Sequence, residues 1–211
     1  MGFITEAEVL KALQEHLSAF VEIVQGGWDD YLAYPIEQRI VYTTTTRAGI
    51  VHDHQIERAS RYAASSQGIS IRDCYRLKLL VVEVPDCYFA IRIKKLNEMR
   101  MPSNHLTGQV ADFRRQRQLE GIPSSCNLEI GYVLDRLESE IKEICLVYPM
   151  GSKRNYWVSE LSKDGAAMRA RTIGIFQHRK YEEGGEEEES TIVRPKRDGI
   201  IIPLKRDTDE D

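Results

Sequence analysis

The chain has 211 residues, which is enough to bury one sizeable core, and its charged fraction of 29% and hydrophobic fraction of 42% are ordinary for a globular protein. No run approaches the ~20 apolar residues that span a bilayer, and the four cysteines are too far apart for a disulfide framework. The amphipathic N-terminus carries Glu6 and Glu8 and lacks a signal-peptide pattern, so we expect a cytoplasmic protein with free thiols and no membrane association.

The first predicted element is an amphipathic helix. Thr5 and Glu8 have the spacing of a capping box, and Gly26-Gly27 is a stop signal. The helix has two open interpretations: it covers a sheet, or it binds a partner. Its apolar stripe at helical spacing comprises Val9, Leu10, Leu13, Leu17, Phe20, Val21 and Val24, of which Leu13, Leu17 and Phe20 are the candidate partner-binding residues.

The segment after this helix contains one β-like stretch and a second helix. Residues 28–35 are aromatic and acidic and predict a turn, whereas residues 36–46 include four threonines and predict a strand or extended segment. Residues 50–64 place small and apolar side chains at helical spacing. Residues 69–73 are compatible with a further short strand.

The stretch from Leu77 to Leu161 predicts the sheet. Residues 77–84 and 88–93 read as two strands of a hairpin, and a helix at about residues 107–119 follows, capped by Thr107. Three meander strands then begin near Leu128, Ile141 and Tyr156. We therefore predict an α+β fold with about five strands in an antiparallel or mixed sheet, packed by the first helix and the central basic helix.

The C-terminal part of the chain predicts a charged tail. We expect one domain over residues 1–181, with a helical part at 1–68 and a sheet core at 69–161, followed by a tail at 182–211. Residues 182–189 hold six glutamates and cannot bury themselves. The apolar island at Ile200, Ile201 and Ile202 predicts a strand that docks on this sheet or on a partner.

A concentration of positive charge between residues 90 and 118 is the strongest functional signal. Two interpretations stay open: a phosphate-binding surface, or a solvated face screened by salt. The loop at residues 151–154 is also basic and precedes Tyr156 and Trp157, which are core residues or base-stacking platforms. The candidate nucleic-acid-binding residues are Arg92, Lys94, Lys95, Arg114, Arg115 and Arg117.

Catalytic and metal-binding patterns are weak. Asp73, Glu83, Lys94 and Lys95 are the nearest candidates for a metal-dependent nuclease, but Pro85 stands where the PD-(D/E)xK pattern requires lysine. His52 and His54 would point apart on a helix, and no third ligand is placed by spacing. The sequence therefore predicts no metal site and no cofactor.

A set of mostly apolar strand and loop motifs lies at residues 90–96, 102–104, 121–123, 131–134 and 145–151, with Tyr156 and Trp157. These motifs resemble uncharacterised bacterial proteins encoded beside helix-turn-helix regulators of the Cro/C1 type, some of them fused to ImmA/IrrE-like metalloprotease domains. The resemblance covers about a third of the chain and transfers no active-site residue. It implies a toxin–antitoxin-like or phage-related locus and a protein partner.

Two functional hypotheses follow. The first is a component of a bacterial two-component toxin–antitoxin-like or phage-defence module that acts through a partner, such as a helix-turn-helix regulator. The alternative is a metal-dependent nuclease or a nucleic-acid-binding module that uses the basic surface at residues 90–118.

Overall fold

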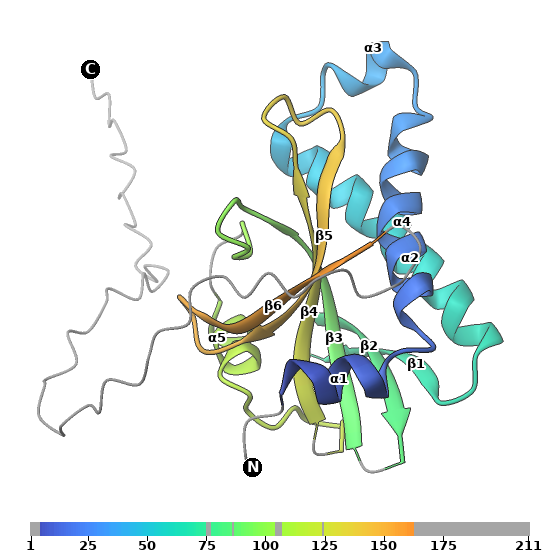
Figure 1. Ribbon diagram of the computed structural model, residues 1–211. Helices are drawn as coiled ribbons and strands as arrows, with labels where there is room; N and C mark the ends of the chain where they lie inside the picture. The colour runs from blue at the N-terminus through green and yellow to red at the C-terminus, as the bar shows by residue number, and fades with distance from the viewer. Residues whose placement is uncertain (1–4, 75–76, 86, 104–106, 124, 163–211) are drawn as a thin grey trace, which may run out of the picture. The chain divides into compact units, whose positions relative to one another are not determined.

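The computed structural model describes residues 5–74, 77–85, 87–103, 107–123 and 125–162. All of them belong to one compact unit, Met1–Ile175. Figure 1 shows the elements, which are α1 (Glu6–Ala12), α2 (Leu17–Leu32), α3 (Ile36–Arg39), α4 (Thr44–Ser65), β1 (Ile69–Cys74), β2 (Leu77–Val84), β3 (Cys87–Leu96), α5 (Gly108–Arg114), β4 (Ser125–Leu134), β5 (Ile141–Pro149) and β6 (Asn155–Leu161).

The six strands form one mixed sheet in the order of the chain, β1-β2-β3-β4-β5-β6. Neighbouring strands are antiparallel except β3 and β4, which run parallel and are joined by the crossover that contains α5. The predicted α+β class is confirmed. The sheet has six strands rather than about five, because residues 69–74 pair along β2 as its edge strand.

The two faces of the sheet carry different layers. Ile91 and Leu128 are register partners on the face that α1, α2 and α4 cover, and they belong to the main core. Arg92 and Glu129, one position further along each strand, lie on the opposite face, because successive side chains of a strand alternate. There Phe113 of α5 packs with Leu79, Val81 and Ala90 of the sheet.

The N-terminal helix begins as predicted but continues differently. The Thr5–Glu8 capping box is present. The predicted single helix is interrupted between Ala12 and Leu17. Its second part, α2, continues through the predicted stop at Gly26-Gly27 to Leu32. A Cβ on Gly27 would lie 2.4 Å from Gln55 Cγ, so this glycine allows close packing of α2 on α4 and does not end the helix.

The prediction of a strand at residues 36–46 is wrong. These residues form α3, a short connection and the start of α4. Thr43 has extended backbone and accepts a hydrogen bond from the backbone N–H of Thr46 at 3.1 Å, so its hydroxyl caps a helix here although its β-branched side chain favours a strand. The second helix is confirmed and is longer than predicted. The helix of the crossover is shorter, and Gln116 with φ 59° follows it.

The apolar stripe of the first predicted helix covers the sheet. Leu13, Leu17 and Phe20 are at most 2% exposed and belong to the core, so in this structure they are not available to a partner. The predicted tail and its docking strand at Ile200, Ile201 and Ile202 lie outside the described residues. Within the described part of the chain, no helix is both long and apolar enough to cross a membrane.

Candidate functional site

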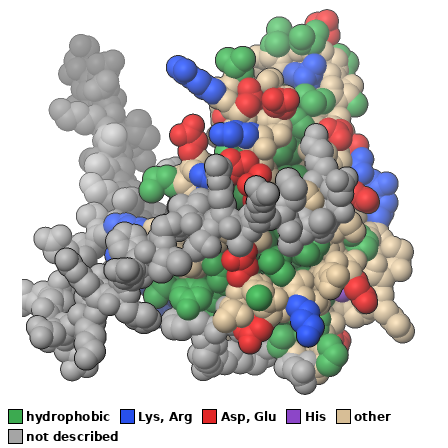
Figure 2. Space-filling view, in the orientation of Figure 1, with side chains coloured by type: hydrophobic (Ala, Val, Ile, Leu, Met, Phe, Trp, Pro, Cys, Tyr) green, Lys and Arg blue, Asp and Glu red, His purple; other side chains and the backbone are tan. Residues whose placement is uncertain are grey.

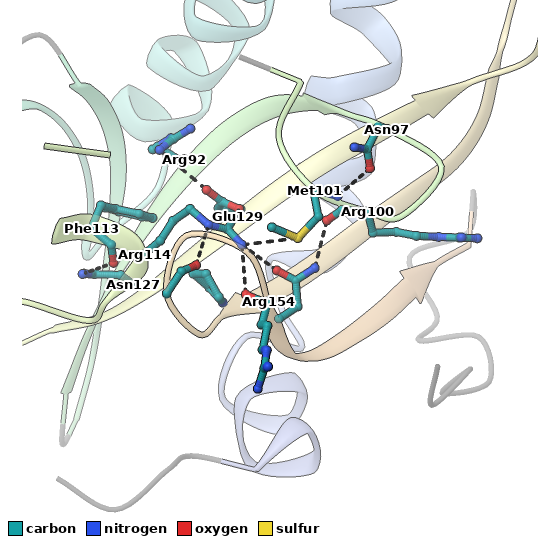
Figure 3. A network of polar contacts seen from close by, with 12 residues as sticks. Arg92, Asn97, Arg100, Met101, Phe113, Arg114, Asn127, Glu129 and Arg154 are labelled. Atoms are coloured by element: carbon teal, nitrogen blue, oxygen red, sulfur yellow. Dashed lines mark hydrogen bonds and ion pairs between the residues drawn. The ribbon is translucent and has the colours of Figure 1, made fainter. Parts of the chain in front are cut away.

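Three ionised side chains meet on the face of the sheet opposite the main helices, and Figure 3 shows them from close by. Glu129 of β4 is fully buried, and it contacts Arg114 of α5 and Arg92 of β3, both 1% exposed. Arg92 Nη1 lies 3.6 Å from Glu129 Oε1, whereas Arg114 Nη1 donates a hydrogen bond to Glu129 Oε2. The buried cluster therefore holds two cations and one carboxylate.

Arg114 makes most of the bonds in this cluster. Its Nε donates to the carbonyl oxygen of Gly151 at 3.0 Å, and its Nη2 donates to the carbonyl oxygen of Arg154 at 3.1 Å and to Oδ1 of Asn155 at 2.7 Å. Asn155 Nδ2 in turn donates to the carbonyl oxygen of Arg100 at 2.9 Å. Arg114 thereby fixes the end of α5 against the β5–β6 loop and the segment that follows β3 (Figure 3).

Two amides support the same junction. Gln116 Nε2 donates to the carbonyl oxygens of Asn127 and Pro149, and the backbone N–H of Asn127 donates back to Gln116 Oε1 at 2.8 Å. Asn127, which is fully buried, donates from its side chain to the carbonyl oxygen of Phe113 at 3.1 Å. The exit from α5 is therefore held by the Asn127 side chain of β4 and, through Gln116, by the backbone carbonyl of Pro149 at the end of β5.

Arg92 differs from Arg114 because none of its guanidinium nitrogens has a hydrogen-bond partner, although all of them are buried. Its guanidinium carbon lies 5.4 Å from the centre of the Phe113 ring, a cation–π distance. Burial lowers the pKa of Arg92 below its ordinary value; the charge of Glu129 opposes this shift, and the charge of Arg114 adds to it. Arg92 is thus a desolvated cation with weak compensation.

Two further basic groups have pKa values that burial and nearby cations lower. Burial, and next the charge of Arg92, lowers the pKa of Lys94 to about 8. Burial, and next the charge of Lys94, lowers the pKa of His52 on α4 to about 4. Both shifts disfavour the charged form, so a positive charge on Lys94 or His52 has a free-energy cost.

The structure separates the six predicted nucleic-acid-binding residues into three groups. Arg92 and Arg114 are buried in the cluster with Glu129. Lys95 faces the other way and its Nζ lies 2.6 Å from Glu138, whereas Lys94 is half-buried beside Arg92. Arg115 and Arg117 are exposed, and Arg117 pairs with Asp112 at 2.9 Å. The six residues therefore do not form one basic surface.

The residues considered for a nuclease or a metal site do not converge. Lys78 Nζ lies 3.4 Å from Asp73, and Glu83 accepts a hydrogen bond from the hydroxyl of Tyr88 at 3.0 Å. His54 contacts the hydroxyl of Tyr34 at 3.1 Å and lies 3.9 Å from Asp30. Over the residues that the structure describes, no group of three or more His, Cys, Asp or Glu residues is placed to hold a metal ion.

A feature that the sequence did not point to is an exposed apolar end of the molecule. In Figure 2, hydrophobic side chains gather at the end that carries α3 in Figure 1. We call the set at α3, the loop after β3 and the β4–β5 turn the apolar end: Ile36 (60% exposed), Ile40 (75%), Val41 (72%), Met99 (79%) and Leu137 (84%).

Ion pairs tie two parts of the apolar end, the β4–β5 turn and the loop after β3, to α4 and to the sheet. Glu138 in the β4–β5 turn pairs with Arg47 of α4 and with Lys95 of β3. Arg100, in the loop after β3, donates hydrogen bonds from Nε and Nη2 to the carboxylate of Glu143 of β5, with Nη2–Oε2 at 2.7 Å. Met99 and Leu137 are therefore carried by segments that are tied to the sheet and to α4.

Comparison with known proteins gives no family: no protein-family model, no curated protein and no solved structure matches the chain.

Proposed function

We propose that this protein works by binding a protein partner through the apolar end. The observation that supports this proposal is the concentration of exposed large hydrophobic side chains. The described residues include seven exposed large hydrophobic side chains. Five of them belong to the apolar end, namely Ile36, Ile40, Val41, Met99 and Leu137, and the other two, Met150 and Tyr156, lie near the β5–β6 loop. Apolar side chains gathered on one surface mark interaction sites more often than scattered single residues do.

The support beneath the apolar end favours the same conclusion. Arg47, Lys95 and Glu138 join α4, β3 and the β4–β5 turn at the base of this surface. A preorganised surface loses less side-chain and loop entropy on association, so more of the burial energy appears as affinity. We infer an apolar partner face, in keeping with a two-component toxin–antitoxin-like or phage-defence module in which a helix-turn-helix regulator is the partner.

The test compares the wild-type chain with a triple variant, Ile36→Gln, Ile40→Gln and Val41→Gln. Met150→Gln is the matched control, because Met150 is also exposed (47%) but lies in the β5–β6 loop. Each tagged protein is expressed in its native host, the co-purified partner is identified by mass spectrometry, and the Kd is then measured with the purified partner. We expect the triple variant to weaken binding by at least about 10-fold.

The outcomes are distinguishable. Since all four positions are exposed, the melting temperatures of the variants should match that of the wild type, which shows that any loss of binding is local. A partner that stays fully bound to the triple variant contradicts the proposal. Sedimentation equilibrium identifies self-association, and a homodimer that the triple variant abolishes would replace the external partner with a second copy of this chain.

A further inference from the structure

Four exposed cations lie on the two segments that meet where α5 approaches the β5–β6 loop, and we call this set the basic corner. Arg115 and Arg117 follow directly on α5, and Lys153 and Arg154 lie in the loop. In Figure 3 the side chain of Arg154 points away from the buried cluster while its backbone carbonyl faces Arg114. The two pairs are about 40 positions apart in the sequence, so only the fold brings them together.

The backbone between these cations is tightly connected. The N–H of Gly151 donates to the carbonyl oxygen of Arg114 at 2.8 Å, while Arg114 Nε donates to the carbonyl oxygen of Gly151 at 3.0 Å. Gln116, between the two α5 cations, donates to the carbonyl oxygen of Pro149 at 3.2 Å. The buried arginine thus serves to place the exposed ones, because its bonds fix where the flanking side chains emerge.

The charge balance at the basic corner is positive. The carboxylates nearest to it in the sequence are Asp112, which pairs with Arg117, and Glu120. The Arg117 and Asp112 side chains are 60% and 44% exposed, and an ion pair this exposed contributes little, so Arg117 exchanges readily onto another anion. Arginine and lysine on one surface provide bidentate and point-like contacts to phosphate oxygens.

An aromatic side chain lies at the edge of the same loop. Tyr156 is 48% exposed and follows Arg154 by two positions, with its ring edge-on to Tyr148 at 5.9 Å between centroids. A partly exposed ring close in sequence to a cationic loop can stack on a base without reading a sequence, since every base has a face that stacks.

We propose that the basic corner binds the phosphate backbone of single-stranded nucleic acid, with Arg115, Arg117, Lys153 and Arg154 as phosphate contacts and Tyr156 as a stacking platform. This site is separate from Ile36, Ile40, Val41 and Leu137 of the apolar end, whereas Met99 lies in the loop whose Arg100 carbonyl oxygen accepts a hydrogen bond from Asn155. The β4–β5 turn with Leu137 precedes β5 and the basic corner follows it, and the nine-residue strand between them spans roughly 30 Å. The protein then holds a partner at one end and a nucleic acid at the other.

The test measures binding of fluorescent 12-nucleotide single-stranded DNA and RNA to the full chain by anisotropy, across a series of salt concentrations. The basic-corner variant replaces Arg115, Arg117, Lys153 and Arg154 with alanine. The matched control removes the same charge from exposed cations elsewhere, namely Lys11, Arg61, Arg136 and Lys142. A third variant, Tyr156→Leu, removes only the stacking ring.

We expect the basic-corner variant to lose at least about 10-fold in affinity at low salt and to flatten the salt slope by about 0.7 per lost phosphate contact. The control should keep most of the affinity, and Tyr156→Leu should lose about 5-fold with an unchanged salt slope. Comparison of the DNA and RNA arms identifies the sugar. Duplex DNA and inorganic phosphate serve as competitors, and both should compete poorly.

Three results would overturn the proposal. The first is an equal loss of nucleic-acid affinity in the basic-corner and control variants, because binding would then depend on total charge. The second is competition by poly-glutamate as strong as that by single-stranded nucleic acid, because the surface would then bind any polyanion; the third is an affinity that no variant changes. None of these results affects binding at the apolar end, and loss of a partner in the triple variant there leaves the nucleic-acid arm unchanged.

Discussion

Arg114 and Gly151 bind each other twice, once through the guanidinium of Arg114 and once through its backbone carbonyl. Arg114 belongs to the crossover between the two halves of the sheet, and Gly151 belongs to the loop between the last two strands. With Glu129 as a third participant, one arginine connects α5, β4 and the β5–β6 loop.

Replacement of Arg114 should therefore be costly. In Arg114→Met the buried carboxylate of Glu129 keeps only the contact to Arg92 at 3.6 Å, and three acceptors in or next to the β5–β6 loop lose their donor. Breaking a buried pair from one side costs about 3–5 kcal/mol. Urea unfolding measures the loss. The exposed neighbour provides the control, since Arg115→Met should stay within about 0.5 kcal/mol, and a loss as small for Arg114→Met would show that the cluster does not stabilise the fold.

Replacement of Arg92 should change the stability much less. It is as deeply buried as Arg114, yet none of its donors has a hydrogen-bond partner, so its charge is desolvated with little return. Arg92→Met keeps most of the side-chain volume and leaves the Arg114–Glu129 pair in place. We expect a change below about 1 kcal/mol, in either direction, by the same urea titration. A cost equal to that of Arg114→Met would contradict this asymmetry between the two arginines.

Two helical glycines form a matched pair. An added Cβ at Gly27 would lie 2.4 Å from Gln55 Cγ and 2.9 Å from Gln55 N, whereas one at Gly49 meets no atom within 4 Å. Gly27→Ala should destabilise by about 1–3 kcal/mol because α2 must move off α4. Gly49→Ala should stabilise by about 0.5–1 kcal/mol because alanine favours helix. Thermal unfolding of both variants checks the signs, and the same sign for both would refute the role given to Gly27.

We expect His52 to cause a loss of stability in mild acid. The pKa of His52 falls from 6.5 to about 4 in the fold, chiefly by burial and next by the charge of Lys94; Arg92 and Lys78 add to the lowering, and Asp53 opposes it. As the pH falls through this range, the unfolded chain takes up the proton first, so stability that is fully present above pH 6.5 is lost towards pH 4.

The measurement for His52 is the difference in unfolding free energy between the wild type and His52→Gln at several pH values. Carboxylates titrate in both proteins and cancel in this difference. We expect the wild type to lose on the order of 2 kcal/mol relative to the variant between pH 6.5 and 4. Parallel curves would show that His52 keeps an ordinary pKa.

The elements that were correctly predicted share a local cause. The capping box at Thr5 and Glu8 satisfies backbone donors within one turn, and the central strands follow from period-two apolar patterns. The errors have two causes. Gly27 lies inside a helix because its lack of a side chain admits Gln55 of another helix, which is a distant contact. The threonines near Thr43 lie in and before a helix because a local cap outweighs their β-propensity.

The buried cluster was beyond such local rules. Arg114 lies in a basic run that is typical of a solvated helix face, and its burial depends on Glu129, fifteen positions away on another element. One signal was present. Glu129 is the one charged residue in the run from Cys126 to Leu134, and a carboxylate buried in such a strand requires a cation. The sequence could not show which cation pairs with Glu129, because Arg114, Arg115 and Arg117 lie at similar distances from it along the chain.

The parallel pair at the centre of the sheet has a consequence for folding kinetics. Each antiparallel half, β1 to β3 and β4 to β6, pairs segments that are close along the chain, and such contacts close quickly. The seam between β3 and β4 closes the long loop from Leu96 to Ser125, so we expect it to limit the folding rate. Gly131 lies on this seam, where an added Cβ would meet Leu96 Cγ at 2.4 Å. Gly131→Ala should slow refolding in stopped-flow experiments, whereas substitutions in the β4–β5 turn should chiefly change the rate of unfolding.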